Sequence, residues 1–251
     1  MSKLFISATV FVMLCSCSSE DKTISHNQSD TEKDKGHLNN HTEDYYLVDA
    51  EYEAHICDSL GIDETLIAEI RELSDGKIEP FHYSLSKMYE DGESYEIDPI
   101  RLNGLVIYES NVNSYELVFK LKDDFRALGY SIFLLENNYG IGDEPDMIGV
   151  LKTTNKLDVL DQIQTDGINY DIDNDSLKSI IHEFDLKYDL ELIGASGDWC
   201  EFIIHGKPTD WMSFAEEVYE VCPDVVDQGT GSVEALAESL ETTGTLYFWW
   251  D

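Results

Sequence analysis

Residues 105–135 read LVIYESNVNSYELVFKLKDDFRALGYSIFLL, and this stretch decides the fold class. An apolar run over 105–108 predicts a strand, and apolar residues at helical spacing over 114–128 predict a helix that ends at Gly129. A second apolar run over 130–135 predicts another strand. Strand, helix and strand joined by short links are typical of a βαβ unit with parallel strand pairing.

The flanking sequence extends this unit into an α+β fold. Five large apolar side chains at the end of the chain predict a strand docked in the sheet, because a free terminus would fray. The turn GASGD at 194–198 predicts an antiparallel hairpin. We therefore expect a single domain whose mixed sheet is built from the βαβ unit and the hairpin, with flanking helices; a boundary near Thr165 is the alternative. The other expected helices lie at 62–73, 157–163, 176–184, 211–221 and 233–240, and the other expected strands at 81–85, 148–151, 190–193, 200–204 and 246–250.

The first 16 residues have the features of a secretory signal. Lys3 precedes an apolar or small stretch over 4–16, which is shorter than the roughly 17–25 residues that span a bilayer as a helix. The sequence Leu14-Cys15-Ser16-Cys17 resembles the bacterial lipobox. The resemblance implies cleavage after Ser16 and attachment of diacylglycerol to the Cys17 thiol, with N-acylation by a chain such as palmitate to follow; Cys15 is the alternative acceptor.

Residues 18–44 are polar, and their only large aliphatic side chains are Ile24 and Leu38. Such a segment predicts a disordered tether, whose reach as a flexible coil is about 30 Å. We divide the chain into a signal peptide (1–16), a lipidated N-terminus and tether (17–44), an N-terminal extension of the globular part (45–104) and a C-terminal domain (105–251). The expected location is the cell envelope, anchored by lipid to the outer membrane on its periplasmic or surface face.

Charge narrows the class of partner. The chain has 52 Asp and Glu against 16 Lys and Arg, a formal net charge of -36. Acids outnumber bases by 33 within residues 45–251, so the charge belongs to the folded surface. A surface this negative repels phosphate backbones, which excludes nucleic acid, and it attracts basic proteins.

The motifs that could carry chemistry are incomplete. Asp171–Asp175 starts like a calcium loop, but Ser176 and His182 stand where an EF-hand needs Gly and Glu. Gly229–Ser232 precedes a helix without the further glycine or the lysine of a phosphate loop. We therefore expect helix caps at both places and predict no metal and no cofactor. Cys57, Cys200 and Cys222 lack metal spacing, and the sequence leaves their disulfide pairing open.

Polar and aromatic residues near the C-terminus form the candidate binding site. Adjacent tryptophans in a strand point to opposite faces, so one of the pair can line a contact surface while the other enters the core; alternatively, both are covered internally. The candidate residues are Asp198, Asp224, Asp227, Gln228, Gly229, Trp249 and Trp250.

The same region carries a resemblance. The stretch CPDVVDQGTGSVE at 222–234, followed by LYFWWD at 246–251, resembles the end of a bacterial family of domains of unknown function, numbered four-two-five-three. The segments TDGINY at 165–170 and GASGD at 194–198 also resemble its pattern. The resemblance covers about residues 105–251 and implies no established activity.

Two functions follow as hypotheses. The first is a non-enzymatic, membrane-anchored module that binds a basic protein; an immunity-type protein that neutralises a cationic toxin is one version. The second is a hydrolase or metal-dependent enzyme that uses Asp198, Asp224 and Asp227, because clustered carboxylates suit acid–base work or a divalent cation.

Overall fold

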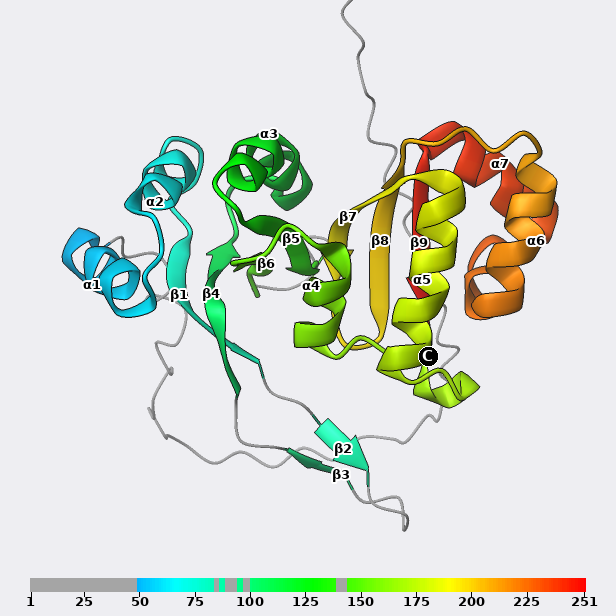
Figure 1. Ribbon diagram of the computed structural model, residues 1–251, viewed down its shortest axis with the longest axis horizontal. Coiled ribbons are helices and arrows are strands. Elements are labelled where there is room, and N and C mark those ends of the chain that lie inside the picture. The colour runs from blue at the N-terminus through cyan, green and yellow to red at the C-terminus, as the bar shows by residue number, and fades with distance from the viewer. Residues whose placement is uncertain (1–48, 84–85, 89–93, 97–99, 139–143) are drawn as a thin grey trace, which may run out of the picture. The chain divides into compact units, whose positions relative to one another are not determined.

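The computed structural model describes residues 49–83, 86–88, 94–96, 100–138 and 144–251, all within one compact unit from Asp44 to Asp251 (Figure 1). The expected signal peptide, Cys17 and the whole of the polar segment 18–44 lie outside the described residues. In chain order the elements are α1 (Ala50–Leu60), α2 (Glu64–Arg71), β1 (Lys77–Tyr83), β2 (Ser86–Met88), β3 (Ser94–Glu96), β4 (Ile100–Glu109), α3 (Ser114–Ala127), β5 (Ser131–Glu136), β6 (Asp146–Leu151), α4 (Lys156–Ile163), the 3₁₀ turn η2 (Ile168–Tyr170), α5 (Asn174–Tyr188), β7 (Leu190–Ala195), β8 (Trp199–Ile204), α6 (Trp211–Val221), the π-helical turn η3 (Val225–Thr230), α7 (Val233–Thr243) and β9 (Thr245–Trp249).

Seven of these strands form one mixed sheet in the order β1-β4-β6-β5-β7-β8-β9, and β2 and β3 form a separate pair. The expected α+β fold with its docked C-terminal strand is confirmed. β4, α3 and β5 form the expected βαβ unit, but the expectation of direct parallel pairing was wrong. β6 lies between β4 and β5 and pairs antiparallel with both, which leaves those two strands parallel to each other without contact. The parallel pair in the sheet is β5 with β7.

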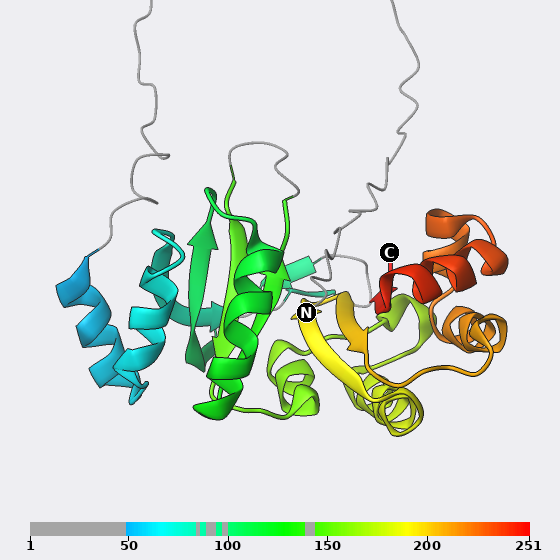
Figure 2. The same ribbon diagram turned by 90° about the horizontal axis from the view of Figure 1, so that it is seen from above.

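Alternating side chains of β5 show why the helices form two groups. Successive residues of a strand point to opposite faces. Ile132 and Leu134 belong to the apolar cluster of α1, α2 and α3, whereas Phe133 and Leu135 belong to the cluster of α4–α7. Figures 1 and 2 show the first group beside β1, β4 and β5 and the second beside β7, β8 and β9. Both helix groups therefore bury an apolar stripe against the sheet.

The hairpin of β7 and β8 is antiparallel, as the turn at 194–198 predicted. β9 adds to its outer side, with Trp199 opposite Trp249 and Ile203 opposite Thr245. Because β9 is the last strand in the order, the end of the chain lies at one edge of the sheet. This placement brings the C-terminal residues beside η3 and the end of α6.

One helix was missed by the sequence reading. α1 begins after Asp49, whose carboxylate accepts hydrogen bonds from the amides of Glu51 and Tyr52. Three acids, one of them the buried Glu53, interrupt its apolar stripe, whose buried apolar members are Ile56 and Cys57. Together with α2, α1 packs into the cluster that includes β1 and β4.

Candidate functional site

Asp224 is the centre of a hydrogen-bonded corner at the C-terminus. Its side chain accepts from the Tyr170 hydroxyl at 2.5 Å, from Gln228 Nε2 at 3.0 Å and from the backbone amide of Asp251 at 2.9 Å. The residue is 3% exposed. A buried carboxylate with three donors is satisfied, so Asp224 fastens the last residue of the chain to η3 and to η2.

Those hydrogen bonds determine the protonation states of Asp224 and Tyr170. Burial raises the pKa of Asp224, but the Tyr170 hydroxyl, the Asp251 amide and Gln228 together hold it below its ordinary value. The hydrogen bond to Asp224 raises the pKa of Tyr170 to about 12. Asp224 therefore stays an acceptor and Tyr170 a donor at neutral pH, and neither is poised to transfer a proton.

Trp250 is part of the apolar core and does not line an exposed contact surface. It is 2% exposed, and its indole stacks on Phe248 with centroids 5.7 Å apart and planes at 8°. Its Nε1 donates to the carbonyl of Val221 at 3.3 Å. Gly167 approaches the indole so closely that a Cβ there would lie 2.8 Å from a ring atom. Trp250 thus contacts β9, the loop before η2 and the end of α6.

Trp249 is half-buried, and its backbone is bound to Cys222. The Cys222 thiol donates to the carbonyl of Trp249 at 2.8 Å, and the amide of Trp249 lies 3.3 Å from the same sulfur. Burial is the main cause that raises the pKa of Cys222 to about 11. The residue is therefore a neutral thiol that helps to hold β9, and it lacks the thiolate character of a nucleophile. Cys57, Cys200 and Cys222 are all free and buried.

The remaining candidates lie on the surface. Asp198 is exposed in the hairpin turn, and the partial loss of water around its carboxylate, together with the nearby Asp251, raises its pKa. Its backbone carbonyl accepts from the Trp250 amide at 3.0 Å. Asp227 and Gln228 are exposed on η3, and Tyr219 donates to Asp227 at 3.1 Å. Gly229 is half-exposed on the same turn.

The structure therefore brings Asp224, Gln228 and Trp250 together as a fastening for the chain end, while Asp227 faces outward. No group of three or more His, Cys, Asp or Glu side chains suited to hold a metal ion occurs in the part of the chain that the structure describes. The donors around Asp224 already engage both of its carboxylate oxygens.

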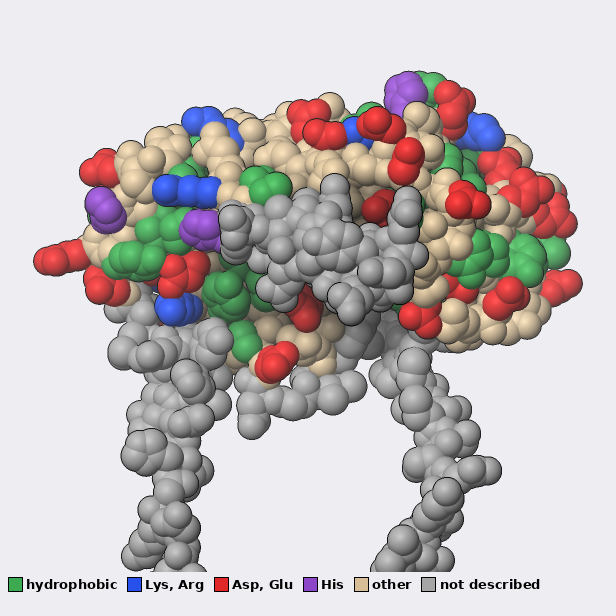
Figure 3. Space-filling model, turned by 90° about the horizontal axis from the view of Figure 1, so that it is seen from below, with side chains coloured by type: hydrophobic (Ala, Val, Ile, Leu, Met, Phe, Trp, Pro, Cys, Tyr) green, Lys and Arg blue, Asp and Glu red, His purple; other side chains and the backbone are tan. Residues whose placement is uncertain are grey.

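An acidic face lies next to this corner. No Lys or Arg follows Lys207, and residues 208–251 contain ten Asp or Glu. In Figure 3, acidic side chains gather at the end of the folded unit that carries α6 and α7. Glu217 is paired with Lys187 at 2.9 Å. We define the acidic face by its exposed members, Glu216, Glu220, Asp227, Glu234, Glu238 and Glu241.

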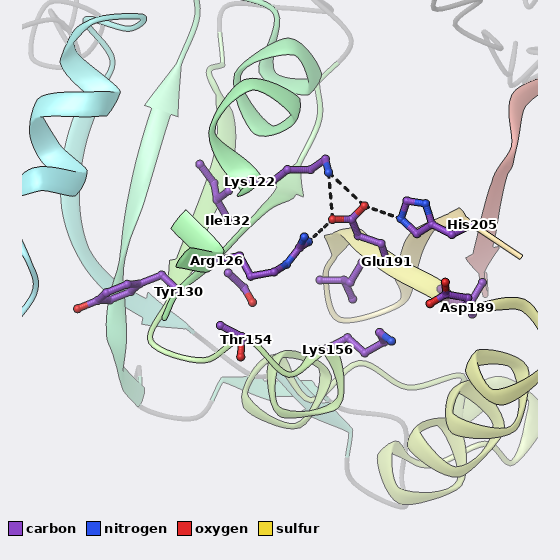
Figure 4. Close-up of a pocket in the computed structure, with 12 residues that line it drawn as sticks. Lys122, Arg126, Tyr130, Ile132, Thr154, Lys156, Asp189, Glu191 and His205 are labelled. Atoms are coloured by element: carbon purple, nitrogen blue, oxygen red, sulfur yellow. Dashed lines mark hydrogen bonds and ion pairs between the residues drawn. The ribbon is translucent and has the colours of Figure 1, made fainter. Parts of the chain in front are cut away.

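A second cluster lies where α3 meets β7, and it was not predicted from the sequence. It consists of Lys122, Arg126 and His205 around Glu191. Glu191 on β7 is 8% exposed and contacts Lys122 Nζ at 3.1 Å, the Arg126 guanidinium and His205 Nε2 at 2.8 Å (Figure 4). Burial raises the pKa of Glu191, but Arg126, Lys122 and His205 outweigh it and lower the pKa to about 2. The signal in the sequence was two cations at positions i and i+4 of a helix in a chain poor in cations.

Glu201 is a second buried carboxylate in the hairpin. It is 9% exposed, and the Tyr115 hydroxyl on α3 donates to it at 2.8 Å. Burial raises its pKa to about 7, against the smaller opposing effect of Tyr115. A carboxyl group with this pKa is a candidate proton carrier, but no second titrating partner for it is found among the described contacts.

Within the described residues, no helix is both long enough and apolar enough to cross a bilayer.

Comparison with known proteins shows a similarity to one family and gives no activity. No curated protein and no solved structure matches the chain. Residues 147–251, from β6 to the C-terminus, match the model of a family described as Domain of unknown function (DUF4253). This part of the chain is therefore similar to that family. The matched range is shorter than the 105–251 expected from the resemblance.

Proposed function

We propose that this protein is a non-enzymatic binding module that engages a basic protein through the acidic face of α6, η3 and α7. The observation that carries the proposal is the segment 208–251, which contains ten acids and no Lys or Arg. Complementary charge speeds the encounter of such a face with a cationic surface. Neutralisation of an extracytoplasmic cationic toxin, as an immunity-type protein would do, is one form of this function.

Repulsion within the face supports the proposal. Glu216 and Glu220 lie one helical turn apart on α6, and Glu234 and Glu238 are spaced in the same way on α7. Like charges at this spacing destabilise a helix by about 0.2–0.5 kcal/mol per pair. A basic partner would relieve that repulsion on binding, so part of the binding free energy would come from strain already present in the free protein.

The proposed address is the cell envelope. A diacylglycerol group on the thioether of Cys17, with an added acyl chain such as palmitate, would hold the protein at the membrane, since several acyl chains bind stably where one binds only marginally. The segment 18–44 would then separate the folded unit from the bilayer by about 30 Å. A Cys17→Ala variant tests the anchor. It should lose partition into detergent and the added lipid mass, both of which the wild type should show.

The binding face is tested with two triple variants that remove equal charge. In the first, Glu216, Glu220 and Glu238 become Gln; in the control, three exposed acids of the α1–α2 region are neutralised as Asp58→Asn, Glu72→Gln and Asp75→Asn. Fluorescence anisotropy with a deca-lysine peptide, at low and high salt, gives the affinity of each protein. Binding should weaken about tenfold or more in the first variant, which corresponds to about 1.4 kcal/mol.

The control variant should bind nearly as well as the wild type, and high salt should weaken binding by all three proteins. Equal losses in the two triple variants would show attraction by net charge alone and would contradict a defined binding face. The same two variants can then be tested with the basic proteins that the wild type retains from an envelope extract. A protein that binds the acidic face should be retained by the control variant and lost by the first variant.

A further inference from the structure

A pocket of about 250 Å³ opens between α3, the start of β5, the start of α4 and the start of β7 (Figure 4). Its lining is polar and cationic, with Lys122 and Arg126 from α3, Lys156 from α4 and His205 after β8. A small charged molecule fits this space better than an apolar one.

The local charge differs from that of the rest of the chain. Residues 45–251 contain 12 Lys and Arg, and three of them line this one pocket. Two carboxylates, Glu191 and Asp189, complete the charged lining. Asp123 and Asp185, which pair with Arg126 and Lys156, lie outside the lining, so three fixed cations and two carboxylates face the pocket itself. A small anion inside the pocket would therefore meet more cations than carboxylates, whereas acids outnumber bases by 33 over residues 45–251.

Glu191 gives the cations a fixed arrangement. Lys122 and Arg126 lie one turn apart on α3 and would repel each other if left alone. The buried carboxylate of Glu191 lies between them and also binds His205, as the dashed lines of Figure 4 show. Groups held in this way need little ordering when a ligand arrives, which favours binding. The contacts also show that these cations are spaced to hold an oxyanion.

Donors remain for a ligand after these contacts. A guanidinium has five N–H groups in a planar fork that matches carboxylate and phosphate. Arg126 uses Nη2 for Glu191 and Nη1 for Asp123, and its side chain is 48% exposed. Lys156 has three donors, one of which lies 2.6 Å from Asp185. Arg126 and Lys156 can therefore bind an anion without losing their present partners.

We propose that this pocket is a binding site for a small oxyanion, a molecule with a carboxylate or phosphate group. Arg126 and Lys156 contact the anion directly. Glu191 acts as a positioning residue that holds Lys122 and Arg126 in place. The site is separate from the acidic face, so it goes beyond the proposed function and does not depend on it.

NMR titration of the full chain tests this site. Inorganic phosphate and, separately, citrate are added at constant ionic strength set with chloride, while the His205 imidazole and the amides of Ser131, Ile132 and Thr154 are followed. Saturable shifts confined to these pocket residues are expected in the wild type. Arg126→Gln and Lys156→Gln should each weaken binding about tenfold or more, because each removes a charge-assisted hydrogen bond to the anion.

The matched control is Lys120→Gln. Lys120 lies on the same helix, is paired with Glu116 at 3.7 Å and is absent from the pocket lining, yet its removal changes the net charge equally. This variant should bind like the wild type. Lys156→Gln leaves the Glu191 contacts intact, so it tests the site even if Arg126→Gln fails to fold.

Saturation by phosphate alone would assign a phosphate ligand, and saturation by citrate alone a carboxylate ligand; either supports the site. Two results would overturn it. One is the absence of saturable shifts with both anions in the wild type. The other is equal weakening by Lys120→Gln and Lys156→Gln, which would mean that only net charge matters.

Discussion

Two glutamates of the same hairpin have opposite pKa shifts, and their partners explain the difference. Glu191 and Glu201 are both buried, which raises the pKa of each. Arg126, Lys122 and His205 lower the pKa of Glu191 to about 2, whereas Glu201 accepts from the neutral hydroxyl of Tyr115 and burial raises its pKa to about 7. Whether a buried acid is charged thus depends on cations that helix α3 brings to it, and not on burial alone.

Glu201 should make the stability of the protein depend on pH. The folded state keeps its proton up to about pH 7, whereas the unfolded chain releases it near the ordinary value of 4.5. The free energy of unfolding that depends on Glu201 is therefore highest below pH 4.5 and falls as the pH rises through 7. Glu201→Gln should nearly match the wild type at pH 4.5 and exceed it by about 3 kcal/mol at pH 8.

Urea unfolding at the two pH values measures this difference. Gln keeps an acceptor for the Tyr115 hydroxyl, so the comparison isolates the charge. A Gln variant that is less stable than the wild type at pH 8 would show that Glu201 is ionised and well solvated in the folded state.

Asp224 and Asp227 are three residues apart but should differ strongly in their effect on stability. Asp224→Asn keeps one acceptor oxygen but places an amide NH₂ where the other oxygen accepts, against at least one of the three donors, and should cost about 1–3 kcal/mol. Asp227→Asn, on the exposed side of η3, should stay within about 0.5 kcal/mol of the wild type. Thermal or urea unfolding of both variants measures the contrast. Equal and small effects would show that the corner does not fasten the chain end.

At the scale of elements, the docking of β9 depends on a close approach between Gly167 and Trp250. A Cβ at 167 would lie 2.8 Å from the indole, less than real Cβ contacts allow. Gly167→Ala should therefore push the indole out of its stack on Phe248 and cost about 1–3 kcal/mol. Unfolding experiments give the cost, and Trp fluorescence reports the indole. An unchanged emission spectrum with unchanged stability would contradict this packing.

Elements with regular apolar patterns could be predicted from the sequence, and those that depend on distant partners could not. α6 was predicted at its observed bounds because its apolar stripe and the terminating Pro223 are both local signals. The insertion of β6 between β4 and β5 leaves no local trace, since either order satisfies the same alternation of side chains. The apolar stripe of α1 was too short to see among its acids.

The same distinction applies to the candidate sites. Asp224, Gln228 and Trp250 were selected as binding residues because they are polar or aromatic near the C-terminus, but their hydrogen bonds make them a structural fastening. The cationic pocket combines residues separated by up to 83 positions, from Lys122 to His205. The spacing of Lys122 and Arg126 is visible in the sequence, but only the folded sheet brings Lys156, Glu191 and His205 to them.

At the scale of the whole molecule, the net charge of -36 is a cost to the folded state. A compact chain holds its like charges closer together than an unfolded one, so self-repulsion favours unfolding. Salt screens this repulsion, because the Debye length falls from about 30 Å at 0.01 M to about 8 Å at 0.15 M. Salt also weakens the attractive ion pairs, but the chain has few cations to form them. The screening of repulsion should therefore have the larger effect on stability.

The melting temperature should therefore rise between 0.01 and 0.15 M sodium chloride. The triple variant of Glu216, Glu220 and Glu238 should be more stable than the wild type at low salt and should gain less from added salt, since part of its repulsion is already gone. Differential scanning calorimetry in sodium chloride, repeated in choline chloride, separates screening from binding of a particular cation. A melting temperature that falls with salt would mean that ion pairs such as those of Glu191 outweigh the repulsion among the acids. An equal gain by the triple variant and by the α1–α2 control would place the repulsion over the whole surface, and not on the acidic face.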